Sequence, residues 1–120
     1  MYNTQMEGLK DISWEGSSFE DLQKFPPEAR SGMGYQLHLV QSGEMPDDWK
    51  TLGNLGKGIS GVYEIRLSAD KSIYRTAYVA KFDGYVVVLH CWQKKTQATS
   101  DSDKAIIVKR YRDAKEYFSG

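Results

Sequence analysis

The second half of the chain contains three strand-like runs separated by very short turns, and this arrangement limits the fold more than any other feature. The runs are Gly61 to Ser68, Ser72 to Phe82 and Tyr85 to Lys95, and all are rich in β-branched and aromatic residues. Asp83-Gly84 is a two-residue turn of the kind that matches the twist of a hairpin, and Ala69-Asp70-Lys71 forms the other turn. Strands joined this closely pair with their neighbours, so the sequence predicts an antiparallel meander.

The first half predicts two helices. Ser17-Ser18, followed by two acidic residues, is typical of a helix start and predicts a helix from there to about Phe25. Pro26-Pro27 ends this helix and is compatible with the first turn of the next. Apolar residues at helical spacing predict that second helix over 28–41, and Gly43 follows as a stop signal. The two helices should form a hairpin.

Three further segments complete the predicted domain. Asp11 to Trp14 has apolar residues at alternate positions and predicts a short strand, residues 43–60 read as a long loop, and residues 103–118 predict a helix capped by Ser100 or Ser102. The expected fold class is therefore α+β. A twisted antiparallel sheet, made of the meander and the N-terminal strand, packs against the helical hairpin, with a C-terminal helix. At 120 residues the chain is expected to form one domain, residues 1–120.

Composition restricts the class of protein. Cys91 is the only cysteine, so no intramolecular disulfide can form, and its place in a strand predicts a core residue. The longest apolar run is too short to span a bilayer, which makes a cytoplasmic protein the default expectation, with no membrane association. Residues 1–60 hold 5 basic and 9 acidic residues, whereas residues 61–120 hold 11 and 7. This asymmetry is compatible with a polyanionic partner.

The turns also predict the register of the meander. If Asp83-Gly84 and Asp70-Lys71 are both two-residue turns, Arg75 lies opposite Trp92 on one side and opposite Arg66 on the other. One sheet face then carries Tyr63, Ile65, Leu67, Tyr74, Thr76, Tyr78, Ala80, Phe82, Tyr85, Val87, Leu89 and Cys91, and this apolar face should pack on the N-terminal helices. The other face starts with Ala77, Val79, Val86 and Val88 and ends with Glu64, Arg66, Arg75, His90, Trp92 and Lys94.

The cationic end of that second face predicts a site for RNA. Arginine binds phosphate oxygens bidentately, His and Lys exchange protons when neighbours lower their pKa, and an indole ring can stack on a base. RNA carries its own nucleophile in the 2′-hydroxyl, so cleavage requires no metal or other cofactor. Arg75 would stabilise the charge on the phosphorane, and His90, Lys94 or Lys95 would transfer protons. The choice among these three remains open.

Each of these residues also has a plain structural interpretation. A histidine at a strand end is commonly a surface or hydrogen-bonded structural residue, and a Lys-Lys pair is commonly a solubilising edge. Trp92 alone is more typical of core packing than of a base platform. Only the conjunction of these residues on one face favours a site.

Several stretches resemble the HigB-type toxins of the RelE superfamily. They are YEIRLS at Tyr63 to Ser68, YRTAYVAKF at Tyr74 to Phe82 and VVLHCWQKKTQAT at Val87 to Thr99, with ISWEGSSFEDLQKFP at Ile12 to Pro26 resembling the opening strand and helix. The string from His90 to Gln97 is the most specific part.

This resemblance implies a RelE-like fold and a toxin of a type II toxin–antitoxin system. Such toxins are typically ribosome-dependent mRNA endonucleases that inhibit translation without a metal, and a helix-turn-helix antitoxin neutralises them. The positions carried over are Arg75, His90, Lys94 and Lys95 as catalytic candidates, and Arg66, Trp92, Lys57 and Lys81 as RNA-binding candidates. Two other functions stay open: a non-catalytic RNA- or partner-binding module of the same fold, and a relative that poisons DNA gyrase.

Overall fold

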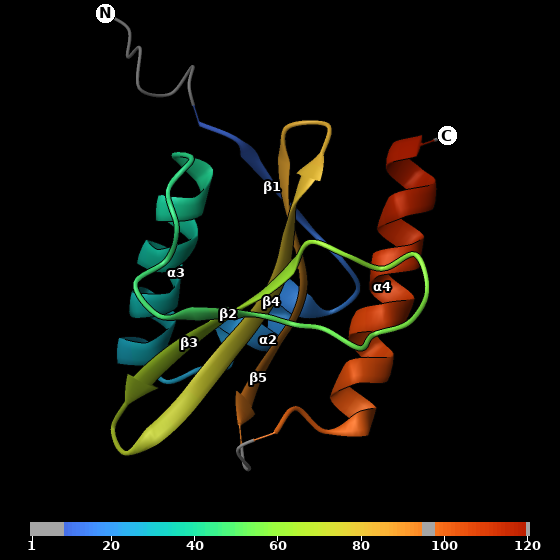
Figure 1. Ribbon diagram of the computed structural model, residues 1–120. Coiled ribbons are helices and arrows are strands. Elements are labelled where there is room, and N and C mark those ends of the chain that lie inside the picture. The colour runs from blue at the N-terminus through green and yellow to red at the C-terminus, as the bar shows by residue number, and fades with distance from the viewer. Residues whose placement is uncertain (1–8, 95–97, 120) are drawn as a thin grey trace, which may run out of the picture.

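Five strands form one twisted sheet at the centre of the protein (Figure 1). The computed structural model describes residues 9–94 and 98–119. The strands are β1 (Asp11–Trp14), β2 (Trp49–Thr51), β3 (Val62–Ala69), β4 (Ser72–Phe82) and β5 (Tyr85–Lys94). Their order across the sheet is β1-β5-β4-β3-β2, with β1 parallel to β5 and every other pair antiparallel. The prediction of an antiparallel sheet was therefore wrong for the N-terminal strand β1 alone. The predicted meander is confirmed as β3, β4 and β5.

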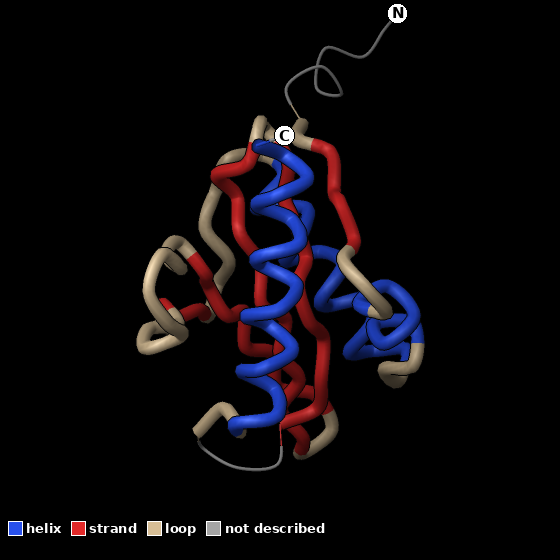
Figure 2. The backbone as a smooth tube through the Cα atoms, turned by 90° about the vertical axis from the view of Figure 1, so that its right-hand side faces the viewer, coloured by secondary structure: helices blue, strands red, loops and turns tan. Residues whose placement is uncertain are grey.

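Helices cover both faces of this sheet, as the two views in Figures 1 and 2 show. The N-terminal pair, α2 (Ser18–Gln23) and α3 (Pro27–Gln41), packs on one face, and α4 (Asp101–Ser119) packs on the other. The backbone N–H of Asp103 donates to Ser100 Oγ at 3.1 Å, which makes Ser100 the capping serine. The predicted α+β fold is confirmed. Within the described part of the chain, no helix is both long and apolar enough to cross a membrane.

One strand lies where the sequence predicted only loop. Residues 49–51 form β2, which pairs with β3 and ends the sheet on that side. A strand of three residues is too short to show a usable alternation of apolar and polar residues. The remainder, residues 52–61, runs out to α4 and back to β3 (Figure 1).

The turns set the register as predicted at the end of the sheet that carries Arg66, Arg75 and Trp92. Asp70, Lys71, Asp83 and Gly84 all have positive φ, as two-residue hairpin turns of this type require. Arg66 pairs with Arg75, and Arg75 pairs with Trp92.

Two bulges, however, change the face of the sheet toward which side chains in the middle of β5 and at the end of β4 point. Leu89 is an extra residue on β5, between the pairs Ala77–His90 and Tyr78–Val88, and β4 holds an extra residue between Val79 and Phe82. The second offset cancels the first, so the predicted pairing is right on either side of them. The face prediction was wrong for Phe82, Tyr85, Val87 and Leu89, which pack toward α4, and for Val86 and Val88, which pack toward α2 and α3.

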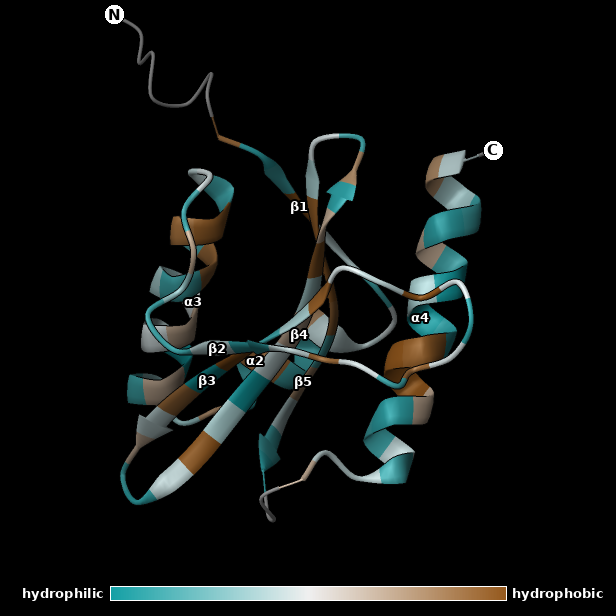
Figure 3. Cartoon of the chain, in the orientation of Figure 1, coloured by the Kyte–Doolittle hydropathy of each residue, from teal (hydrophilic) through white to brown (hydrophobic). Residues whose placement is uncertain are grey.

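The sheet therefore separates two hydrophobic cores. Figure 3 shows hydrophobic segments along the central strands and on α3 and α4. The first core joins α2 and α3 to the sheet through residues such as Met33, Leu37 and Tyr78, and the second joins α4 through Ile107, Tyr111 and Leu89. The polar end of the α4 face lies beyond the second core.

Candidate functional site

A buried ion pair forms the base of the candidate site. Glu64 on β3 and Arg75 on β4 are 0% and 1% exposed, and Arg75 donates a hydrogen bond to Glu64 Oε2. The hydroxyl of Thr99 donates to the other carboxylate oxygen of Glu64 at 3.0 Å. Burial lowers the pKa of the Arg75 guanidinium, while Asp48 acts in the opposite direction. The sequence pointed to Arg75 but not to Glu64, which neutralises it.

Lys94, at the end of β5, is the most perturbed cation of this region. Its Nζ atom is buried and has no hydrogen-bond partner among the described residues. Burial, reinforced by the charges of Arg75, Lys50 and Arg66, lowers the pKa of Lys94 to about 8. A lysine with this pKa is in part a neutral amine near pH 7 and can therefore accept a proton.

Lys50 joins the site from β2 and is a residue that the sequence analysis missed. It lies directly opposite Glu64 on the neighbouring strand. Its pKa is lowered by burial and by Arg75, Arg66 and Lys104. The available signal was local, because Trp49 and Thr51, both strand-favouring types, flank Lys50 in a segment otherwise full of turn residues.

Arg66 lies at the rim of the same end of the sheet. It pairs with Arg75 across β3 and β4, and its side chain is 34% exposed. Asp48 is its ionic partner, with 3.9 Å between Nε and the carboxylate oxygen. The pair is long, and the buried Nε atom makes no hydrogen bond within the described residues, so Arg66 remains available to another anion.

His90 and Trp92 are buried between β5 and the start of α4. His90 Nε2 lies 2.8 Å from Asp103 Oδ1, and the imidazole stacks on the Trp92 ring with centroids 4.7 Å apart. The side chain of His90 is 8% exposed and Trp92 is 9% exposed. Burial lowers the pKa of His90, although Asp103 opposes this effect. Both residues thus connect the sheet to α4, and Asp103, the hydrogen-bond partner of His90, was not identified from sequence.

The other predicted residues do not join this group. Lys81 lies six residues along β4 from Arg75, about 20 Å away in an extended strand. Its Nζ donates to Ser60 and lies 5.3 Å from the Tyr111 ring centroid. Lys57 is exposed in the segment that reaches α4. Lys95 lies outside the described residues.

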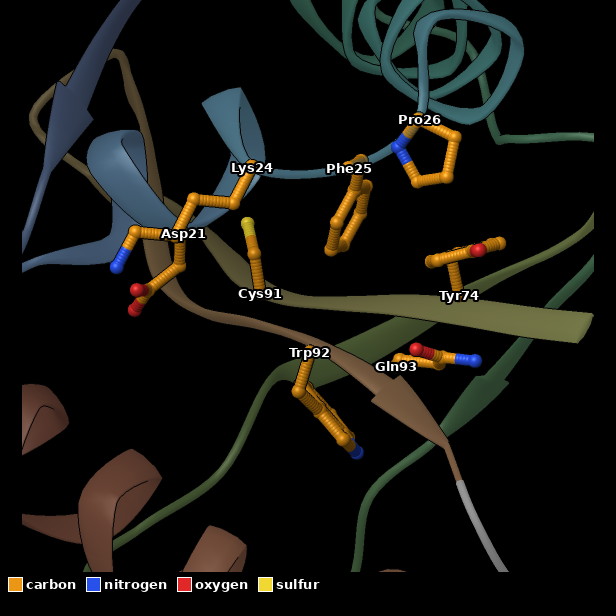
Figure 4. A pocket seen from close by; sticks show the side chains of 8 residues that line it. All are labelled: Asp21, Lys24, Phe25, Pro26, Tyr74, Cys91, Trp92 and Gln93. Carbon is orange, nitrogen blue, oxygen red and sulfur yellow. The ribbon is translucent and has the colours of Figure 1, made fainter.

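A separate pocket opens on the opposite face of the sheet (Figure 4). Phe25, Pro26 and Tyr74 line it, with Asp21, Lys24, Gln93, Cys91 and Trp92. Cys91 points toward α2, whereas the Trp92 ring points away on the other side of β5. Burial raises the pKa of Cys91 to about 12, which keeps the thiol protonated and unreactive, as expected of a core cysteine.

The assembled site is chemically suited to an anion. Lys50, Arg66 and Lys94 surround the Arg75–Glu64 pair, so four cations outnumber the three nearby carboxylates, Glu64, Asp48 and Asp103, of which Asp103 is bound to His90. In residues 9–94 and 98–119 there is no group of three His, Cys, Asp or Glu side chains that could hold a metal ion.

Two solved structures of similar fold cover most of this chain. One is the RelBE2 toxin–antitoxin complex from Mycobacterium tuberculosis, with a TM-score of 0.51, 20% identity, and coverage of 72% of this chain and 92% of that chain. The other is an arginine double mutant of the Escherichia coli toxin RelE in the free state, with a TM-score of 0.60, 16% identity, and coverage of 85% and 97%. These similarities establish a RelE-like fold.

A family model supplies the remaining comparison. No protein in the curated set matches this chain. The model described as phage-derived protein Gp49-like (DUF891) matches residues 20–112, a span that includes every described residue of the site. The chain therefore belongs to the phage-derived Gp49-like family and has the fold of RelE toxins.

Proposed function

We propose that the chain is the toxin of a type II toxin–antitoxin pair and that it cuts mRNA on the ribosome. The observation that carries the proposal is the group of cations at one end of the sheet, Lys50, Arg66 and Lys94, around a buried arginine. The RelE-like fold supports it, because both similar structures are of toxins or a toxin–antitoxin complex. The reaction is attack of the ribose 2′-hydroxyl on the adjacent phosphate, with no metal.

In this mechanism Lys50 and Arg66 bind the scissile phosphate. Arg66 reaches a phosphate oxygen from the exposed rim, and Lys50 does so from the edge strand. Arg75 lies beneath them and adds positive charge as the phosphorane develops. His90 and Trp92 hold the first turn of α4 in position through Asp103.

Lys94 is the proposed general base. With a pKa of about 8, about one tenth of the Lys94 side chains are neutral at pH 7. The neutral amine takes the proton of the 2′-hydroxyl as its oxygen bonds to phosphorus. Lys50, whose pKa is also lowered, gives a proton to the departing 5′-oxygen. The products are a 2′,3′-cyclic phosphate and a free 5′-hydroxyl, and Lys95 is a further candidate for contact with the RNA.

The partner and subtype follow from the same proposal. The similar M. tuberculosis structure contains a toxin with its antitoxin, which supports an antitoxin as the partner of this chain as well. The string His90 to Gln97 favours the HigB type, for which the antitoxin is a helix-turn-helix protein. The site of action is the cytoplasm, where the ribosomes are.

A second candidate is a non-catalytic RNA- or partner-binding module. The burial of His90 and Trp92 and the neutralisation of Arg75 by Glu64 favour it, because three of the predicted site residues are covered in this conformation. This module would bind through the same cations without cutting.

Inducible expression in a bacterial host tests the two candidates. Wild type should arrest growth, and purified protein added to programmed ribosomes should cut the mRNA. Lys94→Gln should lower the single-turnover cleavage rate at least about 100-fold, the usual contribution of a general base. Lys115→Gln is the matched control, since Lys115 is exposed at the far end of α4 and should leave the rate unchanged.

The readouts separate the possible results. Growth arrest with intact mRNA would favour the binding module over the nuclease. Cleavage by Lys94→Gln at the wild-type rate would remove Lys94 from the mechanism. Absence of both arrest and cleavage by wild type would contradict the toxin assignment.

A further inference from the structure

Glu64 is a buried carboxylate in the middle of cations that a phosphate would use. Three of the cations around it lie on the same sheet face: Lys50 opposite Glu64, Arg66 two residues along β3, and Arg75 as its ion-pair partner. Both of its oxygens are engaged, one by Arg75 and one by Thr99. Glu64 therefore holds the one guanidinium that lies at the base of the site.

Three cationic donors of this cluster have no acceptor within the described residues. They are Nε of Arg66, Nε of Arg75 and Nζ of Lys94, and all three atoms are buried. Buried donors normally have partners, because an unsatisfied one costs free energy. The Glu64 carboxylate already accepts hydrogen bonds from Thr99 and from the terminal nitrogen of Arg75, so it cannot also accept from these donors. The site thus offers more donors than its internal anion can fill.

We propose that Glu64 is an internal substitute for the substrate phosphate, and that an RNA phosphate binds by displacing its carboxylate from Arg75. The proposal rests on the proposed function for the identity of the anion as RNA. The exchange keeps Arg75 paired with one negative charge, because a phosphodiester and a carboxylate each carry one, and the added charge is offset by the surplus of cations around the site. It also brings acceptor oxygens to the three unsatisfied donors.

The displaced carboxylate of Glu64 can pair with a second cation, Lys50. Lys50 is the direct cross-strand neighbour of Glu64, so a rotation of the side chain can move the carboxylate from one cation to the other. The move breaks the hydrogen bond from Thr99, which lies two residues before the start of α4. Binding of phosphate is thereby coupled to release of Thr99, and the free protein keeps its central arginine covered.

Anion-dependent stability tests this inference without any need for cleavage. Thermal unfolding of wild type and Glu64→Gln is followed while sodium sulfate replaces sodium chloride at constant ionic strength. Glu64→Gln should unfold at a lower temperature in chloride, and sulfate should restore it with an apparent Kd at least tenfold tighter than that of wild type. Asp48→Asn is the matched control, since it removes an exposed carboxylate beside Arg66, and its sulfate response should stay within twofold of wild type.

A gentler variant covers the case in which Glu64→Gln does not fold. Thr99→Val removes one hydrogen bond to Glu64 and changes no charge. It should tighten the apparent Kd for sulfate about two- to tenfold, the range expected for loss of one competing hydrogen bond. A sulfate response equal to that of wild type in the variants that fold would overturn the inference.

A second arm identifies the source of the phosphate. Binding of a short RNA with a 2′-deoxy residue at the cleavage position, measured by fluorescence anisotropy, should tighten in Glu64→Gln in parallel with sulfate. Tightening for sulfate alone would overturn the assignment to RNA and leave a site for a free anion. If Glu64→Gln binds both sulfate and RNA more tightly, as expected, but wild type does not cleave mRNA, the result would contradict the nuclease and not the displacement of Glu64.

Discussion

At the scale of single residues, the site is governed by a shortage of carboxylates. Glu64 is committed to Arg75, and Asp48 makes only a long, exposed pair with Arg66, so Lys94 keeps a buried ammonium with no partner in the described chain. Burial and like charges make that ammonium costly, and the cost appears as a lowered pKa. The same imbalance that makes Lys94 a proton acceptor also makes it a stability liability.

The stability of the protein should therefore depend on pH through Lys94. Its pKa in the folded state is about 8, below the ordinary value of 10.5, so between these values the unfolded state binds more protons and stability rises with pH. Lys94→Met should raise the free energy of unfolding at pH 7 by about 1–2 kcal/mol. The gain should shrink toward zero as the pH approaches 10.5. Urea unfolding across this range measures it.

Lys115→Met serves as the control, since Lys115 is exposed on α4. A gain for Lys94→Met that does not change with pH would mean that packing of the methionine, rather than removal of the charge, produces it.

At the scale of elements, α4 is fixed to the sheet at a second point, one residue before His90 on β5. Arg110 donates to the carbonyl of Leu89 at 2.9 Å and to Ser17 Oγ at 3.1 Å, so it joins α4 to the β5 bulge and to the start of α2. Gly16 makes room for it, because a Cβ there would lie 2.5 Å from Arg110 Nε. Gly16 also has φ +55°, which side chains rarely adopt.

Two glycine-to-alanine changes should consequently have opposite effects. Gly16→Ala should destabilise the protein by about 1–3 kcal/mol, through both the positive φ and the contact with Arg110. Gly34→Ala should stabilise it by about 0.5–1 kcal/mol, because Gly34 is exposed within α3 and an added Cβ meets no atom within 4 Å. Chemical denaturation compares the two. Equal effects of the two changes would show that the packing of Arg110 against Gly16 is not specific.

At the scale of the whole molecule, charge is balanced overall but uneven locally. The formal net charge is zero, with 16 basic and 16 acidic residues, so no general positive field attracts RNA. On the proposed function, affinity for RNA would come from the few cations at the end of the sheet. Such a toxin would rely on a correctly folded site, and on the ribosome to present the RNA, more than a strongly basic protein would.

The salt dependence of RNA binding should reveal this. Each phosphate contacted on a single strand contributes about −0.7 to the slope of log K against log salt concentration, so two or three contacts give a slope of about −1.5 to −2. Anisotropy of a non-cleavable RNA between about 50 and 200 mM salt measures this slope, and Lys50→Gln should make it shallower by about 0.7. A slope several times steeper would point to a wide basic surface instead.

Sequence reasoning succeeded where local chemistry fixes geometry. The turns Asp70-Lys71 and Asp83-Gly84 require positive φ and a two-residue connection, so they fixed the pairs Arg66–Arg75 and Arg75–Trp92. Hydrophobic spacing predicted α3 and α4 to within two residues at each end. It missed β2, and with it Lys50, because three residues carry no usable period.

The sequence by itself determined the α+β fold, the meander and the gathering of cations on one face, because turn chemistry and residue spacing act over short distances along the chain. Only the tertiary structure decided which partners these side chains have. Glu64 neutralises Arg75, Asp103 binds His90, and Lys94 is left without a partner in the described chain, because burial and pairing depend on which distant elements pack together. The Leu89 bulge likewise depends on tertiary packing, because residues of β5 on either side of the sheet belong to two different cores, and local propensity does not predict it.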